Sequence, residues 1–304
     1  MTRRKPTREF WPALLFLLPN IIGFFAFTAG PVLGSLALSF TSWNLLSPPR
    51  WTGFSNYVDL IGFHQLAGDW VANDPSFWRY LGNTFFLLLG LPLNMAGALG
   101  LALLLNQKIR FSYFYRLVFF LPSILAGVAI YYLWKFMYNP EFGLFNAILR
   151  SVGLQGLKWL ADPNLAKPCL IIMSFWIGVG GTSMVLYLAA LQSVPLELLE
   201  AAKIDGANRW QRFRHITWPS LAPVTFFILT IGLIQGLQSG FDAAYIMTDG
   251  GPYGSTKTIG FYIYEKAYRL FQMGYASAIA WVLFALILAI TLLNWKRGAK
   301  NLAV

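Results

Sequence analysis

The sequence predicts an all-α membrane protein with six transmembrane helices and both termini in the cytoplasm. Only 12% of its 304 residues are charged, against 57% apolar and 17% aromatic, whereas soluble globular domains carry about 25% charged residues. Six apolar stretches reach the roughly 20 residues that a helix needs to cross a bilayer. The basic residues gather in the segments that six spans place on one side. This composition therefore suits lipid rather than water as the surrounding medium.

The six apolar stretches lie at residues 13–40, 80–105, 117–138, 168–191, 221–241 and 276–295. The first is longer than one span requires, and Pro19 and Pro31 inside it predict a tilted or kinked helix. A secretory signal peptide is the alternative interpretation, since basic residues precede the stretch. The apolar part of a signal peptide is about 7–15 residues long, whereas this stretch continues through Phe24, Phe25 and Phe27. We therefore interpret it as an extra N-terminal spanning helix.

The chain is expected to form a single membrane domain. A basic cytoplasmic tail at 1–12 precedes the transmembrane domain at 13–295, whose core helices occupy about 77–295 after the extra helix at 13–40, and a second cytoplasmic tail follows at 296–304. Neither end carries a segment typical of a soluble domain. If the protein moves a solute with ATP, the ATPase is therefore expected to be a separate chain.

The net charge of +11 raises the hypothesis of nucleic-acid binding, which the distribution of the charges disfavours. Most Lys and Arg residues lie at 1–12, at 106–116, in the loop after the fourth span and at 296–304, all on one side if six helices cross. Lys and Arg concentrate in the cytoplasmic loops of membrane proteins. We expect a multi-pass membrane protein, in contact with the lipid bilayer and without a nucleic-acid partner.

The sequence offers no catalytic or metal-binding constellation. Cys169 is the one cysteine, so no intrachain disulfide is expected. His64 and His215 are far apart in sequence and lie outside the apolar stretches. A membrane-embedded enzyme, one alternative class, needs a grouping such as paired aspartates or Ser, His and Asp, and none is apparent. We expect no catalytic residue, no metal site and no cofactor bound by this chain.

The segment Gly250–Thr258 superficially resembles a phosphate-binding loop. That motif requires Gly immediately before the Lys and a second Gly five residues earlier. Here Thr256 precedes Lys257, and the predicted topology puts the segment outside the cell. A Gly/Pro turn is the better interpretation, and the nucleotide-binding hypothesis fails.

The loop between the fourth and fifth spans carries clear helix signals. Pro195 suits the first turn of a helix, where its missing N–H is harmless. Leu196–Lys203 are almost all good helix formers, and Gly206 supplies the left-handed residue that ends a helix. Asn208 and the Gln three residues later predict a capping box for a second helix, which Pro219 is expected to stop. The loop is thus predicted as helix, glycine corner, helix.

The composition of this loop favours contact with another protein. The small Ala201 and Ala202 allow close approach, and Glu200 offers a charge. Trp210 and Phe213, three residues apart, form an apolar anchor beside arginines. The alternative is an amphipathic connector that lies on anionic lipid, with basic residues that serve only topology. The spacing of the loop residues decides between these interpretations.

That spacing is carried by Glu200, Ala201, Ala202, Gly206, Ile216 and Pro219. It resembles the signature of the membrane-spanning permease subunits of bacterial ABC importers that depend on a binding protein. The signature runs Glu-Ala-Ala, three residues, Gly, nine residues, Ile, one residue, then usually Leu-Pro. Trp218 stands where Leu is commoner, which keeps the position apolar.

The resemblance extends to the first span, to Phe119–Pro122 at the third span and to Thr248–Pro252 before the last span. These segments are similar to the carbohydrate-uptake branch, of the maltose and glycerol-phosphate type. The resemblance implies that the loop docks in a cleft of a cytoplasmic ATPase dimer that uses ATP and Mg. It also implies a second, non-identical permease subunit and an extracytoplasmic solute-binding protein that delivers the sugar. Under this hypothesis the chain lies in the bacterial plasma (inner) membrane and is not itself an enzyme.

The fifth span suggests where a solute passes. Gly232, Gly236 and Gly240 recur every four residues and predict a seam for close helix packing. Polar side chains follow i, i+3, i+4 and i+7 on a different face: Gln235, Gln238, Ser239 and Asp242. We expect this stripe to face a cavity, since intramembrane polar residues usually do.

Amide side chains both donate and accept hydrogen bonds, as sugar hydroxyls require, and an aromatic side chain such as Trp176 can stack on the apolar face of a sugar. The alternative is that Gln235 and Gln238 bond to neighbouring helices. Asn83, Asn94 and Gln192 are secondary candidates.

These features predict the membrane-spanning subunit of an ATP-driven importer. It would form half of the pathway for a sugar or related polyol and couple to the ATPase through loop 196–219. An ABC permease for a non-sugar solute is one alternative, because the loop signature is shared beyond sugars. An ion-coupled secondary transporter is another. It would show internal repeats and ionisable residues inside the spans, and only Asp242, at a span edge, qualifies.

Overall fold

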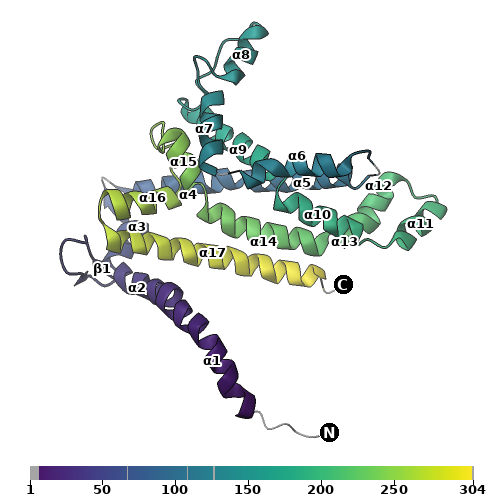
Figure 1. Ribbon diagram of the computed structural model, residues 1–304. Coiled ribbons are helices and arrows are strands. Elements are labelled where there is room, and N and C mark those ends of the chain that lie inside the picture. Colours follow the sequence, from purple (N-terminus) through teal and green to yellow (C-terminus); the bar gives the residue numbers. More distant parts are fainter. Residues whose placement is uncertain (1–6, 67, 108, 126, 303–304) are drawn as a thin grey trace. The chain divides into compact units, whose positions relative to one another are not determined.

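The computed structural model describes residues 7–66, 68–107, 109–125 and 127–302, which are predominantly helical (Figure 1). The chain divides into two compact units, one of Met1–Asp74 with Ile263–Val282 and the other of Pro75–Tyr262 with Leu283–Val304. Residues 1–6 of the predicted N-terminal tail and 303–304 of the C-terminal tail lie outside the described residues, as does position 108 in the predicted inner segment 106–116.

The first unit begins with a long apolar helix made of α1 (Thr7–Phe24), the π-helical turn η1 (Phe25–Ala29) and α2 (Gly30–Ser39). Its stretch Trp11–Ser39 is long and apolar enough to cross a membrane, and none of its most apolar part is buried. The irregularity lies at the π-turn just before Pro31, whereas α1 accommodates Pro19. Gly30 suits this turn because a Cβ there would lie 2.7 Å from the Phe25 carbonyl oxygen.

A structured loop follows α2 in the same unit. It contains β1 (Thr41–Ser42) paired antiparallel with β2 (Arg50–Trp51), α3 (Ser55–Ile61), and β3 (Phe63–Leu66) paired antiparallel with β4 (Asp69–Ala72). The buried Asn56 amide donates to the carbonyl oxygens of Ser39 and Thr41 at 2.8 and 2.9 Å. The hydroxyls of Tyr57 and Ser39 share a hydrogen bond of 2.6 Å. These bonds fix α3 to the end of α2 and to β1.

The second unit contains α4 (Pro75–Leu88), α5 (Gly90–Leu105), α6 (Ser112–Ile124), α7 (Gly127–Met137), α8 (Leu144–Ser151), α9 (Pro163–Gly178), α10 (Thr182–Gln192), α11 (Leu196–Ile204), α12 (Arg209–Arg212), the π-turn η2 (Phe213–Thr217), α13 (Trp218–Ser220), α14 (Ala222–Gln238) and α15 (Phe241–Thr248). The elements α16 (Ile259–Tyr264), η3 (Glu265–Arg269) and α17 (Met273–Leu302) complete the chain, and α16 and α17 contribute to both units.

Three stretches of the described residues are unbroken candidate spans: Trp11–Ser39, Pro75–Leu105 and Met273–Lys296. Three more pass the same test as bent pairs, namely α6 with α7, α9 with α10, and α12–α13 with α14, bent by 94°, 46° and 61°. The described part of the chain therefore holds three candidate spans, or up to six if each bent pair is one span. The six predicted stretches each correspond to one of these. The positions of the termini relative to the membrane stay a prediction.

Close packing explains the glycines at the break between α9 and α10. A Cβ on Gly180 would lie 1.9 Å from the carbonyl oxygen of Phe119 in α6, and a Cβ on Gly178 would lie 2.8 Å from the side-chain oxygen of Asn94 in α5. Gly181 then adopts an extended conformation and begins α10. The bend thus lets two neighbouring helices approach the backbone of this segment.

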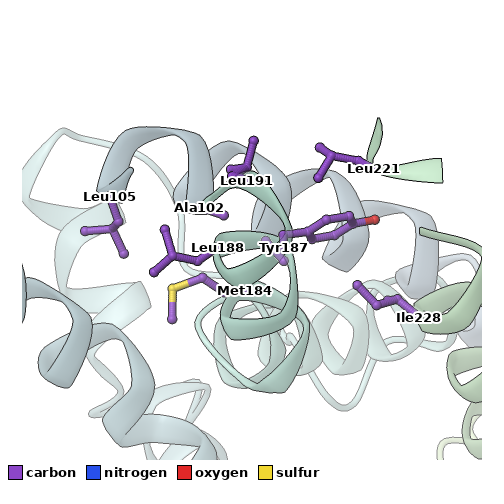
Figure 2. Packing of buried hydrophobic residues seen from close by; sticks show 9 residues of the cluster. Ala102, Leu105, Met184, Tyr187, Leu188, Leu191, Leu221 and Ile228 are labelled. Carbon is purple, nitrogen blue, oxygen red and sulfur yellow. The ribbon is translucent and has the colours of Figure 1, made fainter. Parts of the chain in front are cut away.

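Figure 2 shows the apolar core that α5, α10 and α14 share. Ala98 and Ala102 of α5 are fully buried, and their small side chains let α10 pack closely through Met184 and Tyr187. Leu221, just before α14, is also fully buried. This core anchors both ends of the segment that joins α10 to α14, and that segment contains the predicted coupling loop.

Candidate functional site: the coupling loop and a polar cavity

The coupling loop (residues 196–219) begins with the predicted helix and glycine corner. Helix α11 starts after Pro195, and Gly206 takes a left-handed conformation with φ of 82°. The backbone N–H of Gly206 donates to the Lys203 carbonyl at 3.2 Å, and that of Ala207 to the Ala202 carbonyl at 2.9 Å. A Cβ on Gly206 would meet nothing within 4 Å. The backbone conformation, rather than space, therefore favours glycine here.

The second helix of the coupling loop begins with the predicted capping box. The Gln211 backbone N–H donates to Asn208 Oδ1 at 2.9 Å, and the Asn208 backbone N–H donates to Gln211 Oε1 at 2.8 Å. Two N–H groups that a helix start leaves without intrahelical partners are thereby satisfied. The start of α12 is thus fixed by local hydrogen bonds.

The prediction that Pro219 stops this second helix is wrong. The chain passes from α12 through the π-turn η2 into α13, and Pro219 lies inside α13. Proline is tolerated there beside the π-turn, where the α-helical hydrogen-bond pattern is already interrupted and the Trp218 N–H bonds to the Phe213 carbonyl. The change of direction comes after Ser220, where the helices bend by 61° into α14.

The residues of the loop signature lie largely in the open. Glu200, Ala201, Gly206 and Pro219 are exposed, while Ala202 and Ile216 are half-buried. Helix α11 contributes no buried residue to the described structure, although it carries apolar side chains. Figure 1 shows α11 and α12 at one end of the second unit, with α15 and α8 towards the other end. An apolar, exposed helix at the end of a helical unit is a surface suited to a partner.

The aromatic pair of the coupling loop has a contact within the chain. The rings of Trp210 and Phe213 stack with centroids 5.7 Å apart. Both side chains also line a groove against α5 and α14. The pair predicted as an anchor for another protein is therefore partly engaged by the chain's own helices.

A cavity of about 470 Å³ lies within the second unit, among α4, α5, α9, α10, α14 and α15. Of the predicted path residues, Gln235 and Ser239 line it, whereas Gln238, Asp242 and Trp176 are not among its lining residues. The other polar side chains of its wall are Thr84, Asn94, Ser174, Thr182, Ser183 and Thr258. This wall offers both donors and acceptors among apolar side chains.

The polar stripe does not continue along one helix as its spacing predicts. Helix α14 ends at Gln238, Ser239 is extended, and Gly240 has a φ of 96° before α15 begins. Asp242 therefore belongs to a different helix from Gln235. The break is feasible because glycine adopts positive φ readily. Thr258 packs against it, since a Cβ on Gly240 would lie 3.0 Å from the Thr258 methyl.

The glycine seam packs as predicted, but it does not lie on a face separate from the cavity. A Cβ on Gly232 would lie 2.4 Å from Leu91 Cδ1, and a Cβ on Gly236 would lie 2.5 Å from Leu88 Cδ1. Both glycines nevertheless line the same cavity as Gln235. The seam thus brings α14 against α4 and α5 at the cavity wall.

Trp176 belongs to an aromatic cluster outside the cavity lining. Its ring meets Trp134 edge-on at 5.7 Å, and Trp134 in turn packs against Tyr138 and Phe145 at 5.5 and 5.7 Å. Sequence spacing carried no information about the contact between Trp134 and Trp176, because the two rings come from α7 and α9.

The secondary candidates Asn83 and Asn94 take different roles. Asn94 lines the cavity, and its buried Oδ1 has no hydrogen-bond partner among the described residues. Asn83 instead donates to the carbonyl oxygens of Gly254 and Lys257 at 3.0 and 2.9 Å. Asn94 can be identified in the sequence because its amide side chain lies within an otherwise apolar span.

The segment after α15 forms a compact turn, as its glycines and proline predict. Asp249 and Gly250 adopt left-handed conformations with φ of 48° and 77°. The Thr256 side chain is fully buried, shares a hydrogen bond of 2.6 Å with the Thr248 hydroxyl and donates to the Gly251 carbonyl. These hydroxyls are thus committed to the turn itself.

Comparisons with known proteins agree with this architecture. The family described as "Binding-protein-dependent transport system inner membrane component" matches residues 96–295. The probable ABC transporter permease protein YesP of Bacillus subtilis (strain 168) is 40% identical over 289 residues, which cover 93% of this chain and 89% of YesP. The lactose transport system permease protein LacF of Rhizobium radiobacter is 36% identical over 294 residues, 94% of each chain.

Solved structures agree as well. A bacterial alginate ABC transporter, in complex with an alginate pentasaccharide-bound periplasmic protein, contains a chain that matches with a TM-score of 0.83 and 25% identity over 96% of both chains. The family match covers most of the sequence, and the relatives align along nearly its whole length. The chain belongs to the family of inner membrane components of binding-protein-dependent transport systems.

Proposed function

We propose that this chain forms one half of the translocation pathway of an ATP-driven importer for a sugar or a related polyol. The proposed contact with the ATPase rests on a single observation. Helix α11 is exposed, has no buried residue and displays Glu200 and Ala201. The carbohydrate part is supported by the family membership, by the relative named for lactose transport and by the structural neighbour that transports alginate.

The proposed partners follow from the family. A cytoplasmic ATPase dimer supplies energy from ATP and Mg, a second and non-identical permease supplies the other half of the pathway, and an extracytoplasmic binding protein delivers the solute. The basic segments favour a cytoplasmic position for both termini and for the coupling loop. The chain is then a multi-pass protein of the plasma membrane that has no ATPase activity of its own.

The proposed mechanism is alternating access. Closure of the ATPase dimer on ATP displaces residues 196–214, and the displacement reaches α14 through the bend after Ser220. A partner shifts a conformational equilibrium only through a difference in its affinity for the two states. The coupling loop is therefore proposed to engage the ATPase differently in the inward-open and outward-open states.

The cavity is proposed as part of the solute path. Gln235, Ser239 and Asn94 present amide and hydroxyl groups to it, and such groups both donate to and accept from sugar hydroxyls. The unpartnered Oδ1 of Asn94 is a hydrogen-bond acceptor that a sugar hydroxyl could satisfy. The proposed path does not include Gln238, Asp242 and Trp176, because these residues do not line the cavity.

The test is reconstitution of the chain in proteoliposomes with its ATPase, second permease and binding protein. Uptake of a sugar panel and of an amino-acid panel is measured with and without ATP inside the vesicles. We expect sugar uptake that requires ATP and the binding protein. Uptake that persists without ATP and collapses with an uncoupler would favour ion-coupled transport, and uptake restricted to amino acids would favour a non-sugar permease.

A further inference from the structure

A groove of about 640 Å³ lies in the second unit between α5, α14 and the 210–218 part of the coupling loop. Its wall is made mainly of aliphatic side chains from α5, such as Met95 and Leu99, together with Leu229 of α14. Three aromatic side chains of the coupling loop, Trp210, Phe213 and Trp218, complete the lining from one side. The groove is distinct from the polar cavity, since the two share no lining residue.

The wall of the groove lies on helices that are candidate spans. Helix α5 is the second half of the span Pro75–Leu105, and α14 is the long arm of a bent span. Under the proposed function both helices cross the bilayer, whose core is hydrocarbon. The tryptophans at the loop side suit the membrane–water interface, where aromatic rings concentrate. The groove therefore extends from the level of the lipid headgroups into the acyl-chain region.

The charge at this groove is positive. Arg214 is the one charged side chain among the lining residues, and it is exposed. Among the described residues, its guanidinium has no hydrogen-bond or ion-pair partner. Arg209 and Arg212 precede it in the same short helical segment and keep the local charge positive. A groove with an apolar wall and a cation at its edge is complementary to an amphipathic anion.

We propose that this groove binds an anionic phospholipid, with one acyl chain along α5 and the phosphate at Arg214. A guanidinium matches phosphate geometry and can donate two parallel hydrogen bonds to it. Basic pockets between transmembrane helices on the cytoplasmic side bind anionic headgroups. The inference rests on the proposed function for the cytoplasmic position of the loop. The bound lipid would contact the coupling loop and α14 together, so its binding favours the loop position in which the groove is formed.

The test uses the full-length chain in nanodiscs that contain either phosphatidylglycerol or phosphatidylcholine with a photoactivatable acyl chain. Labelled residues are mapped by mass spectrometry. We expect phosphatidylglycerol to label the groove face of α5 and residues 210–218 more strongly than phosphatidylcholine does. Arg214→Gln should lower the phosphatidylglycerol labelling about fivefold, the effect of one basic residue near an anionic surface. Leu99→Trp, which narrows the groove beside α5, should lower labelling with both lipids.

Arg209→Gln is the matched control, because Arg209 belongs to the same segment but does not line the groove. It removes the same charge outside the groove and should lower phosphatidylglycerol labelling clearly less than Arg214→Gln does. Equal labelling by both lipids, or equal loss in Arg209→Gln and Arg214→Gln, would overturn the proposal. The proposal would also be overturned if the groove were shielded from lipid in the assembled complex and Leu99→Cys cross-linked to the second membrane subunit.

Labelling requires neither transport nor ATP, so failure of the lipid site and failure of the importer function are separable. The side of the loop is read independently with Ala201→Cys and a membrane-impermeant thiol reagent in sealed vesicles of known orientation. Reaction from the outer face would reject the proposed topology, whatever the headgroup preference of the groove.

Discussion

The side-chain amide of Asn83 in α4 donates a hydrogen bond of 2.9 Å to the carbonyl oxygen of Lys257, 174 positions further along the chain. The same amide donates to the Gly254 carbonyl at 3.0 Å, and Lys167 of α9 donates to its Oδ1 at 3.2 Å. Three separate segments thus meet at one buried side chain.

Asn83→Leu should destabilise this junction strongly, because it keeps the branched side-chain shape and leaves two carbonyls without donors. Each unsatisfied buried polar group costs about 1–3 kcal/mol. The expected result is a lower Tm for the purified chain in detergent. Asn164→Leu, at an exposed position of α9, is the control and should change Tm little. Equal Tm values for both variants would mean that the junction contributes nothing measurable.

Gly206→Ala should weaken coupling between ATP hydrolysis and uptake. An L-residue in the left-handed conformation costs about 1–2 kcal/mol, so the corner after α11 is strained. Gly153→Ala is a matched control, since Gly153 has a similar φ of 80° and also has open space around it, but lies outside the coupling loop. The measurement is sugar imported per ATP hydrolysed in proteoliposomes. A similar loss in both variants would point to general instability.

Glu200→Lys should reduce the recovery of the ATPase subunit with the permease, because it reverses an exposed charge within the loop signature. Glu197→Lys makes the same change one turn earlier in α11 and outside the signature. We expect the second variant to retain most of the ATPase. Co-purification from membranes at low salt measures the ratio of the two subunits. If Glu200→Lys retained the full complement of ATPase, this residue would not be a contact.

Gly180→Ala should destabilise the second unit by at least about 1–3 kcal/mol, the range for overpacked cores. The added Cβ would meet the backbone oxygen of Phe119 at 1.9 Å, and a backbone atom cannot swing aside. Gly82→Ala in α4 meets nothing within 4 Å, and Ala favours a helix over Gly by about 1 kcal/mol. In thermal unfolding, Gly180→Ala should therefore lower the Tm and Gly82→Ala should raise it.

Gln235→Leu should raise the KM for the transported sugar by about threefold to tenfold, since one hydrogen bond contributes about 0.5–1.5 kcal/mol. Gln238→Leu removes the same amide from the same helix, but this residue does not line the cavity. Its KM should change less than twofold, by the same reasoning. Uptake rates at a series of sugar concentrations give both values. A larger effect at Gln238 would place the solute path on another face of α14.

The coupling loop was predictable in detail because its signals are local. A glycine at a helix end and an Asn with a Gln three residues later act within a few positions of themselves. Hydropathy also marked every stretch that the structure makes a candidate span. Pro219 was misjudged because a proline inside a helix beside a π-turn and a proline beyond a helix end look alike in sequence. The preceding π-turn decides between them, and it has no clear sequence signal.

The cavity was predictable only in part. Spacing brought Gln235 and Ser239 together correctly, since both precede the break at Gly240. The break itself depends on contacts with Thr258 and Leu87, which come from distant parts of the chain. Asp242 is therefore separated from the stripe by the break, whereas Gln238 precedes the break and still does not line the cavity. Periodicity within one apolar run contains no information about such a contact.

The 61° bend between α13 and α14 makes the junction at Leu221 an elbow. Helix α14 has 17 residues, so at 1.5 Å per residue it is about 26 Å long. A swivel of only about 10° at this elbow would sweep the far end of α14, with Gln235 near it, through about 4 Å. Under the proposed function, a small displacement of the coupling loop would thereby be magnified at the far end of α14, beside the cavity that Gly240 lines.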